Sequence, residues 1–414
     1  MTALTDFLRL NARWLLAGFL LTFASSFGQT FFISVYSAEI RMAFGLSDGQ
    51  WGAIYAFATM ASAGVMVFVG GLTDRFRVRW IGVVILAGLA AAALAMSVAT
   101  EVWALILVVF FLRLMGQGMM GHTAMVGMAR WFVATRGRAV SIAGLGVAVG
   151  EALLPLAFVA LMAVFDWRLL WVAAAMILIV LAPVLWSLLQ RERTPASFVQ
   201  SSSSLGMEGR AWTRGEVARH WLFWMLVPMV LGPAAWNTAL FFHQVHLAEV
   251  KGWSHLEFVQ LFPVYTLAAV SAMLLSGAAV DRFGNARVAS VYFLPGALGF
   301  VLLGLAATPG AALFGMVLIG ATAGANSTIG TTLWAEYFGT RHLGRIRAMT
   351  TALMVVGSAI GPSVTGALID AGMTFDRQTF WIGGYYLLTA ALTGFAVFRA
   401  APALRTLSAP EVPR

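Results

Sequence analysis

The sequence contains one short pattern twice: GGLTDRF at residues 70–76 and GAAVDRF at residues 277–283, 207 positions apart. Two further landmarks repeat with the same spacing, Trp14 with Trp221 and the Gly-Arg pair at 137–138 with the pair at 344–345. One shared pattern could arise by chance, but three in one register indicate an internal duplication. We therefore expect two related halves.

Long apolar runs occupy most of the 414-residue chain, which is 60% hydrophobic and only 10% charged. A soluble domain is about 45–50% apolar and about 25% charged. A membrane-spanning helix needs about 20 mainly apolar residues. Such runs lie near 14–38, 50–70, 80–100, 102–129, 139–165, 167–190, 220–247, 257–280, 288–307, 310–334, 347–371 and 380–399. The predicted fold is an all-α membrane protein with twelve transmembrane helices, arranged as two six-helix bundles related by pseudo-two-fold symmetry.

The only long polar stretch, residues 191–219, divides these runs six and six. Its serine run and charged residues are typical of a flexible linker. We expect an N-terminal bundle at 1–190, a cytoplasmic linker at 191–219, a C-terminal bundle at 220–399 and a disordered cytoplasmic tail at 400–414. The first apolar run is longer than a signal-peptide core of about 7–15 residues, so we expect it to be retained.

The basic residues indicate the orientation. With the N-terminus inside, 21 of the 26 basic residues fall in cytoplasmic segments and four in outer loops. Arginine and lysine collect on the cytoplasmic side of a membrane. We therefore expect a multi-pass protein of the plasma (inner) membrane with both termini cytoplasmic. The formal net charge of +9 is then a topology signal, and we expect no nucleic-acid partner.

The composition also excludes several chemistries. The chain has no cysteine, which rules out disulfides and thiol catalysis. No metal-ligand cluster, nucleophile–base pair or nucleotide-binding loop is visible, so we expect no enzyme, no metal and no cofactor. Transport would run on an ion gradient. The expected partners are a small-molecule substrate, protons and the lipid bilayer, and the expected state is a monomer.

These features resemble the major facilitator superfamily across the whole chain. Its motif Gly-x-x-x-Asp-Arg-x-Gly-Arg-Arg is matched at Gly70 to Arg79, with the second Gly and one Arg replaced, and the second copy keeps the Gly as Gly284. The resemblance implies that Asp74 and Arg75 latch the outward-open state. Such a carboxylate is stabilised at a helix N-terminus. Solvated loop charges that only set topology are the alternative. In the second copy, Asp281 and Arg282 are the corresponding gating candidates.

Only two charges lie near the middle of a span, Arg113 and Glu151. A charge there costs about 2.5–3.5 kcal/mol on insertion scales and is a functional candidate by default. One interpretation is a structural ion pair. The other is that Arg113 binds an anionic substrate or acts as a fixed counter-charge, while Glu151 carries the coupling proton. Arginine keeps its proton, whereas a desolvated glutamate can acquire a pKa near neutrality.

By the same resemblance, spans one, four, seven and ten line the central path. Their polar residues share helical faces, and such groups are tolerated in apolar spans only where they face protein or water. Taken singly, each is more often a helix–helix hydrogen bond than a ligand contact. The predicted substrate-binding residues are Arg113, Gln117, Gln29, Thr30, Tyr36, Trp236, Asn237, His243 and Asn326.

The leading hypothesis is a secondary transporter that moves a small organic anion, a carboxylate, by alternating access with proton coupling, as a symporter. The single fixed cation resembles the monocarboxylate and oxalate–formate branch, although span eight lacks the arginine that this branch often places there. The alternatives are a proton-coupled exporter of amphipathic drugs or metabolites, with Glu151 as the coupling acid, and a non-transporting membrane sensor of the same fold.

Overall fold

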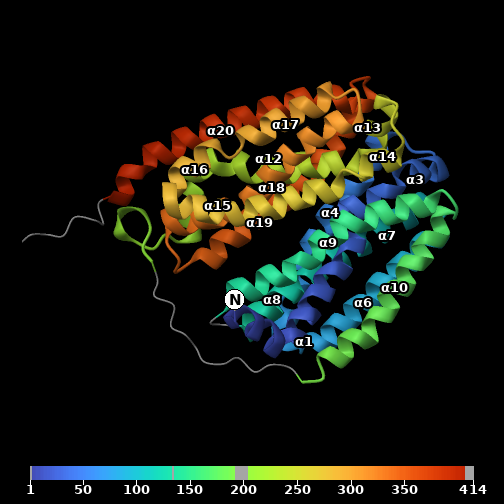
Figure 1. The fold of residues 1–414 in the computed structure, drawn as a ribbon, viewed down its shortest axis with the longest axis horizontal. Coiled ribbons are helices and arrows are strands. Elements are labelled where there is room, and N and C mark those ends of the chain that lie inside the picture. The colour runs from blue at the N-terminus through green and yellow to red at the C-terminus, as the bar shows by residue number, and fades with distance from the viewer. Residues whose placement is uncertain (1, 133–134, 192–203, 406–414) are drawn as a thin grey trace, which may run out of the picture. The chain divides into compact units, whose positions relative to one another are not determined.

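The computed structural model describes residues 2–132, 135–191 and 204–405, and nearly all of them are helical (Figure 1). Twelve helical stretches among these described residues are long and apolar enough to cross a membrane. The predicted number of spans is therefore confirmed. The chain divides into two compact units of six spans each: unit 1 is Met1–Gln200 with Phe241–His246, and unit 2 is Ser201–Leu240 with Leu247–Arg414.

Unit 1 holds the first six spans. Its helices are α1 (Thr2–Ser25), η1 (Ser26–Gly28), α2 (Thr30–Ile33), η2 (Ser34–Tyr36), α3 (Ser37–Phe44), α4 (Asp48–Val69), α5 (Leu72–Arg75), α6 (Val78–Val98), α7 (Val102–Leu112), η3 (Arg113–Met120), α8 (Gly121–Trp131), α9 (Arg136–Met162) and α10 (Trp167–Leu188). α1 packs along α9, and α6 along α10. A Cβ on Gly146 of α9 would lie 2.1 Å from the carbonyl oxygen of Phe19, so this close approach of two helices requires glycine.

Unit 2 holds the last six spans. Its helices are η4 (Met207–Gly209), α11 (Arg214–Arg219), α12 (Trp221–Phe242), α13 (Gln244–Lys251), α14 (His255–Val259), α15 (Phe262–Phe283), α16 (Asn285–Val291), α17 (Leu294–Leu305), α18 (Pro309–Phe338), α19 (Leu343–Asp370) and α20 (Phe375–Arg405). The last residues of α12 and the first of α13 form the segment Phe241–His246 that belongs to unit 1. α18 packs against both α15 and α17.

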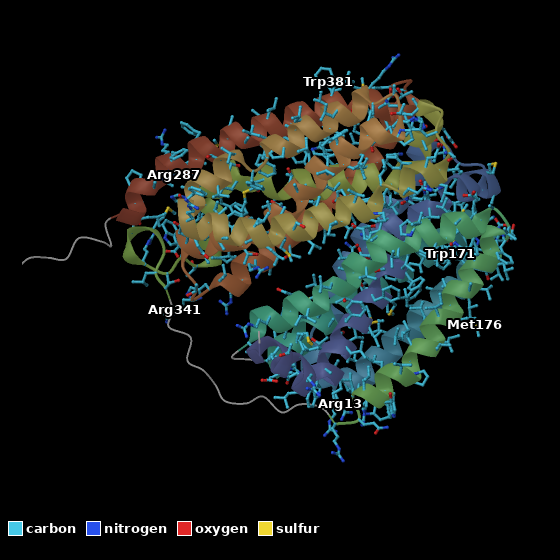
Figure 2. The ribbon with its side chains drawn as sticks, in the orientation of Figure 1. Arg13, Trp171, Met176, Arg287, Arg341 and Trp381 are labelled. Carbon is cyan, nitrogen blue, oxygen red and sulfur yellow. The ribbon has the colours of Figure 1, made fainter. Side chains whose placement is uncertain are left out.

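Large apolar side chains cover the outside of the helices. Met176 of α10 and Trp381 of α20 project outward (Figure 2) and are 53% and 74% exposed, whereas Trp171 of α10 is completely buried. In water such a surface would mark an association site, but against lipid tails it is the ordinary outer face of a membrane protein.

The first span differs from its predicted position. We predicted 14–38, but the apolar helix runs over Thr5–Gly28. The helix stops because Gln29 is extended, with φ −86° and ψ 157°, and shorter helices then continue to Phe44. Hydropathy alone does not register this break, because the residues on both sides of it are apolar.

The predicted flexible linker is only partly outside the described residues. Residues 192–203 lie outside the described residues, whereas 204–219 fold against the rest of unit 2. The Trp212 amide donates to the Phe338 carbonyl at 3.1 Å, and its indole lies under the Arg210 guanidinium at 4.0 Å. Trp212 is only 3% exposed. This second half of the linker is therefore a structured part of unit 2, and the prediction of flexibility is wrong for it.

Two titratable groups begin the helices of this segment. Glu216 accepts hydrogen bonds from the side chain and the amide of Thr213, which hold the pKa of Glu216 below its usual value. His220 accepts the amide of Leu222 on Nδ1 at 3.2 Å at the start of α12, and burial lowers the pKa of His220. The lowered pKa values favour a deprotonated Glu216 and a neutral His220. In these states each side chain accepts a hydrogen bond at the start of its helix, Glu216 at α11 and His220 at α12.

The tail prediction also needs correction at its start. α20 continues to Arg405, so residues 400–405 are helical and not disordered. Residues 406–414 lie outside the described residues.

Candidate functional site

Arg113 lies in the middle of the fourth span, where the helix changes its winding. α7 ends at Leu112, and Arg113–Met120 form the π-helical segment η3 before α8 begins. Short π-helical segments inside α-helices are frequent at functional sites. Arg113 is only 1% exposed, so the cation is enclosed within unit 1.

The guanidinium of Arg113 is surrounded by uncharged groups. Nε donates to Thr59 Oγ1 at 3.2 Å, and Nη1 donates to the Gly28 carbonyl at 3.2 Å and to Thr30 Oγ1 at 3.5 Å. The ring of Tyr55 lies 5.1 Å away, within the range of a cation–π contact. Tyr55 and Thr30 also share a hydrogen bond between their hydroxyl groups. These contacts orient the cation without neutralising it.

The break in span one supplies one of these contacts. α1 and η1 end at Gly28, and the extended Gln29 leaves the carbonyl of Gly28 outside the regular helical ladder. A Cβ on Gly28 would lie 2.1 Å from the Leu112 carbonyl oxygen, and a Cβ on Gly116 would lie 2.6 Å from Gly28 Cα. Only glycine at both positions allows the two backbones to meet here, and this meeting brings the Gly28 carbonyl to Arg113.

Arg113 retains an unused donor. Its Nη2 is buried without an acceptor in the described part of the chain, and no carboxylate among the described residues lies within ion-pair distance of it. The structural ion pair between Arg113 and Glu151 is therefore not formed. Glu151 lies on α9, partly exposed, next to Gly150, whose added Cβ would touch Ser26 of η1.

Two more of the predicted binding residues lie beside this site. Gln29 follows Gly28, and Gln117 follows Gly116, so each directly succeeds one of the two glycines that meet. Both side chains are partly exposed. Tyr36, in contrast, is buried against Trp171, with ring centroids 5.0 Å apart, and does not contact Arg113.

Sequence reasoning missed Tyr55 and Thr59. Both lie on α4 and are four residues apart, so they share one helical face. Tyr55 is fully buried and Thr59 is 2% exposed. A polar pair in an otherwise apolar span was the available signal, but the family resemblance pointed only to spans one, four, seven and ten.

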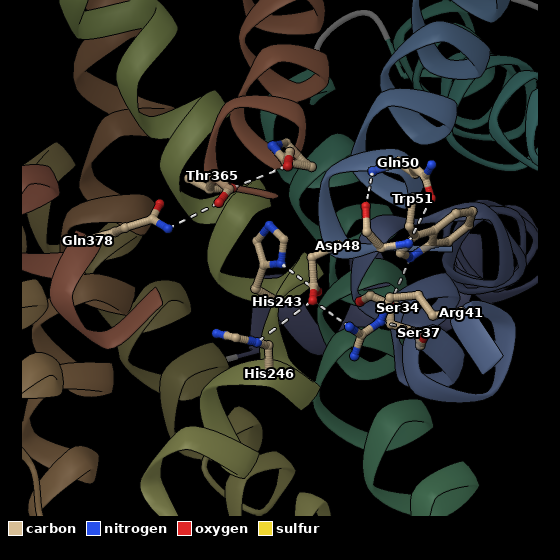
Figure 3. A network of polar contacts seen from close by, with 12 residues as sticks. Ser34, Ser37, Arg41, Asp48, Gln50, Trp51, His243, His246, Thr365 and Gln378 are labelled. Carbon is tan, nitrogen blue, oxygen red and sulfur yellow. Dashed lines mark hydrogen bonds and ion pairs between the residues drawn. The ribbon is translucent and has the colours of Figure 1, made fainter. Parts of the chain in front are cut away.

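A second charged cluster in unit 1 surrounds Asp48 at the start of α4 (Figure 3). Arg41 forms an ion pair with the Asp48 carboxylate. The Nδ1 atoms of His243 and His246 lie 3.8 Å and 3.9 Å from the same carboxylate. His243, a predicted substrate-binding residue, is 2% exposed and is directed at Asp48.

Hydrogen bonds fix the same segment along its length. Gln244 Nε2 donates to Ser34 Oγ at 2.7 Å and to the Phe31 carbonyl at 3.3 Å, and Ser34 Oγ donates to the Phe241 carbonyl at 2.7 Å. Segment 241–246, which joins the end of the seventh span to α13, is thereby held by the contacts of His243 and His246 with Asp48 and by hydrogen bonds to α2 and η2.

The three predicted residues of unit 2 are polar groups on α12 and α18. Asn237 and Asn326 each accept a hydrogen bond from a tyrosine, and Trp236 packs edge-on against Tyr385 with 5.5 Å between ring centroids. None of the three carries a formal charge, so these three positions of unit 2 supply no counterpart of the Arg113 cation.

The duplicated motif lies at helix ends in both units. Arg75 ends α5, Asp281 and Arg282 lie at the end of α15, and all three side chains are exposed. The side chain of Asp74 is outside the described part. The backbone of the first motif is anchored by Arg130, whose Nη2 donates to the Thr73 carbonyl at 3.0 Å. The predicted latch stays a prediction.

Comparison with known proteins identifies the class. The family model of the Major Facilitator Superfamily matches residues 18–287 and 260–413. The chain belongs to this family and is a membrane transporter, not an enzyme. No curated protein sequence matches it.

Solved structures agree on the fold. The chain is similar to a bacterial homolog of the human lysosomal transporter Spinster in its inward-facing, unoccupied conformation, with TM-score 0.71, 18% identity and coverage of 96% of this chain and 97% of that one. The inward-facing, occupied form of such a homolog gives TM-score 0.65 at 18% identity, with 94% of each chain covered.

Proposed function

We propose that this transporter carries a small organic anion, a carboxylate, which binds to Arg113. The observation that supports this is a buried guanidinium with uncharged neighbours and a nitrogen that lacks an acceptor. A buried, uncompensated cation is costly, and an anionic ligand offsets that cost. A carboxylate is the natural partner, because its two oxygens match the forked donors of arginine.

Gln29 and Gln117 complete this proposed site. Each follows a glycine of the close backbone contact beside Arg113, and each has a carboxamide that can donate to a carboxylate oxygen. The Tyr55 ring and the hydroxyl groups of Thr30 and Thr59 hold the guanidinium in place, so we assign them positioning roles.

We assign proton coupling to Glu151. α9 contacts η1 at Gly150 and Ser26, and η1 ends at Gly28, whose carbonyl accepts from Arg113. A change in the charge of Glu151 can therefore act on Arg113 through a three-residue segment. Protonation of a carboxylate within a span also removes the cost of moving its charge, which suits a proton carried together with an anion.

We further propose that both termini are cytoplasmic, on the arginine distribution described above. The loop with Arg41 and Asp48 and the segment with His243 then lie on the outer side. Asp48 would fasten segment 241–246 on that side, and Asp74, Arg75, Asp281 and Arg282 would act as gating residues on the cytoplasmic side. Alternating access requires such contacts to form and break in turn.

The test is uptake by the purified chain in proteoliposomes. Straight-chain monocarboxylates from acetate to octanoate are supplied with and without an inward proton gradient. Arg113→Gln is expected to raise KM about 10- to 100-fold, since hydrogen bonds to charged groups are worth about 1.5–3 kcal/mol. Arg113→Lys keeps the charge but loses the forked pair of guanidinium donors. Its KM is therefore expected to lie between those of wild type and Arg113→Gln. Arg377→Gln, which removes an exposed arginine, is the matched control.

Glu151→Gln is expected to abolish the stimulation by the proton gradient while downhill uptake continues. Anion uptake that is the same in wild type and Arg113→Gln would refute the anion site. If wild type instead moves hydrophobic cations outward and takes up no monocarboxylate, the exporter hypothesis is correct.

A further inference from the structure

Two arginines and three tryptophans gather at the end of unit 1 where α6 begins and α10 ends. Trp80 of α6 and Trp186 of α10 pack edge to face, with ring centroids 4.5 Å apart. The Arg79 guanidinium lies 4.6 Å from the centre of the Trp186 ring. On α1, the Arg13 guanidinium lies 5.7 Å from the ring of the next residue, Trp14. Both distances are within the range of cation–π contacts, and we call these five residues the arginine–tryptophan cluster.

The carbonyls of residues 187–191 hold the cluster in place. Arg13 Nε and Nη2 donate to two of these carbonyls at 2.9 Å and 3.3 Å. Arg79 Nη1 and Trp14 Nε1 donate to two others at 3.4 Å and 3.0 Å. The last carbonyls of a helix lack intrahelical partners, so these bonds cap α10. Capping fixes the positions of both guanidinium groups, and Figure 2 labels Arg13 at this end of unit 1.

Capping does not use all the donors of the cluster. A guanidinium has five N–H groups, and those of Arg13 Nη1 make no hydrogen bond to any described residue. The indole N–H groups of Trp80 and Trp186 also lack an acceptor in the part of the chain that the structure describes. Trp80 is 54% exposed, and Trp186 is partly exposed. These donors are therefore available to a ligand from outside the protein.

The segments that form the cluster carry an excess of positive charge. Residues 5–14, 76–80 and 186–193 contain six arginines and two carboxylates, which are Asp6 and Glu192. Residues 192 and 193 lie outside the described residues and count here by sequence alone. An excess of four positive charges around exposed donors favours an anionic partner.

Exposed apolar side chains lead away from the two packed indole rings. Val84 lies four residues after Trp80 on α6 and is 66% exposed, and Ile179 lies seven residues before Trp186 on α10 and is 46% exposed. Spacings of four and seven residues keep side chains on one face of a helix. α6 packs along α10. The surface that continues from the cluster is therefore apolar on both helices.

We propose that the arginine–tryptophan cluster binds the phosphodiester of an anionic phospholipid, with an acyl chain along the exposed faces of α6 and α10. Arg13 and Arg79 supply the charge, while Arg13 Nη1 and the indole N–H groups of Trp80 and Trp186 donate to oxygens of the head group. Basic pockets between transmembrane helices bind anionic head groups, and tryptophan collects at the level of the head groups.

A lipid suits this site better than a soluble anion. The phosphate of either ligand would meet the same two cations. Only a lipid also covers the apolar side chains, such as Val84 and Ile179, that continue from the rings. The site lies on the outer surface of unit 1 and is separate from the buried Arg113, so the inference does not depend on the substrate.

The test is native mass spectrometry of the full chain purified in detergent. Dissociation constants are measured for phosphatidylglycerol and phosphatidylcholine that carry the same palmitoyl and oleoyl chains. Phosphatidylglycerol is expected to bind about 10- to 30-fold more tightly, because each arginine near a membrane surface contributes a factor of about five. Phosphatidylglycerol is also expected to raise the thermal unfolding midpoint, since a ligand of the folded state stabilises it. Inorganic phosphate, the soluble control, is expected to leave the midpoint unchanged.

Variants locate the site. Arg13→Gln and Arg79→Gln are each expected to lower the preference for phosphatidylglycerol about fivefold. Both changes also remove capping bonds, so Trp80→Phe provides a second measurement, because it keeps a ring and deletes only an indole N–H without a described acceptor. Trp80→Phe is expected to weaken binding about two- to fivefold at an unchanged lipid-free midpoint. Arg287→Gln removes an exposed arginine at the start of α16 (Figure 2) and is expected to leave binding unchanged.

Three results would overturn the proposal. The first is equal binding of phosphatidylglycerol and phosphatidylcholine to wild type. The second is a preference that survives in Arg13→Gln, Arg79→Gln and Trp80→Phe, which would place the lipid elsewhere. The third is a rise of the midpoint with inorganic phosphate that equals the rise with phosphatidylglycerol, which would show a site for soluble anions.

Discussion

Gly116→Ala is the substitution whose effect follows most directly from the geometry around Arg113. A Cβ on Gly116 would lie 2.6 Å from Gly28 Cα and 2.9 Å from Gly28 N, whereas ordinary carbon contacts are about 3.5–4.0 Å. Both neighbours are backbone atoms, which cannot rotate away. The two segments must therefore separate by about 1 Å.

This separation acts on the site as well as on packing. The bond from Arg113 Nη1 to the Gly28 carbonyl, 3.2 Å long, is already at the upper end of the usual range and is lost after such a movement. Overpacking costs about 1–3 kcal/mol, and the lost bond to a charged donor adds about 1.5 kcal/mol or more. We expect unit 1 to be destabilised by about 2.5–4.5 kcal/mol in total.

The assay is thermal unfolding of the purified chain, followed by anion uptake at a permissive temperature. For a unit of this size, each kcal/mol corresponds to about 2–4 °C, so the midpoint is expected to fall by about 5–18 °C, and KM is expected to rise. Gly144→Ala is the control, because nothing lies within 4 Å of a Cβ there. If Gly116→Ala matches Gly144→Ala in both midpoint and KM, the backbone contact does not hold the Arg113 site.

Three further outcomes are expected. Asp48→Asn removes the carboxylate that faces Arg41 and two histidines, so hydrogen exchange of the amides in 244–251 should rise about tenfold, and unchanged exchange would contradict the fastening role. Trp212→Ala deletes a buried indole of the structured linker and should cost about 3 kcal/mol in unfolding free energy, whereas a flexible linker would show no change. His220 has a lowered pKa in the folded state, so its stabilising contribution is present above the unfolded pKa of about 6.5 and is lost as pH falls below it. His220→Gln should flatten this part of the pH–stability profile, and an unaltered slope between pH 7 and 5 would exclude the histidine as its source.

The spans could be predicted from the sequence because a bilayer imposes a length and an apolar composition on every crossing helix. Their ends could not be predicted as well. The first helix begins among polar residues at Thr2 and breaks at Gln29, and neither event changes the average hydropathy much. The structured half of the linker was missed because the serine run and the charged residues of 191–219 as a whole favoured flexibility, although Met207, Trp212 and Val217 are apolar and lie buried.

Arg113 could be singled out as a candidate site residue, since a charge within an apolar span is visible in the sequence itself. Its neighbours could not be predicted, because periodicity shows which residues share a helix face but not which helix that face meets. Thr59 of the second span and the Gly28 carbonyl both became partners through tertiary packing. His243 shows the reverse case, since its spacing favoured the transport path and the fold directed it at Asp48.

The two halves have kept the duplicated scaffold and diverged in its chemistry. The position 207 residues after Arg113 is Gly320, and a Cβ there would lie 2.4 Å from the Tyr265 carbonyl oxygen. No arginine can occupy that position, because α18 and α15 pack too closely. The second half therefore cannot supply a cation at the equivalent place, and its polar groups, Asn237 and Asn326, are neutral. The two units therefore differ in charge at this corresponding position of the repeat, with a buried cation in unit 1 and a close helix contact in unit 2.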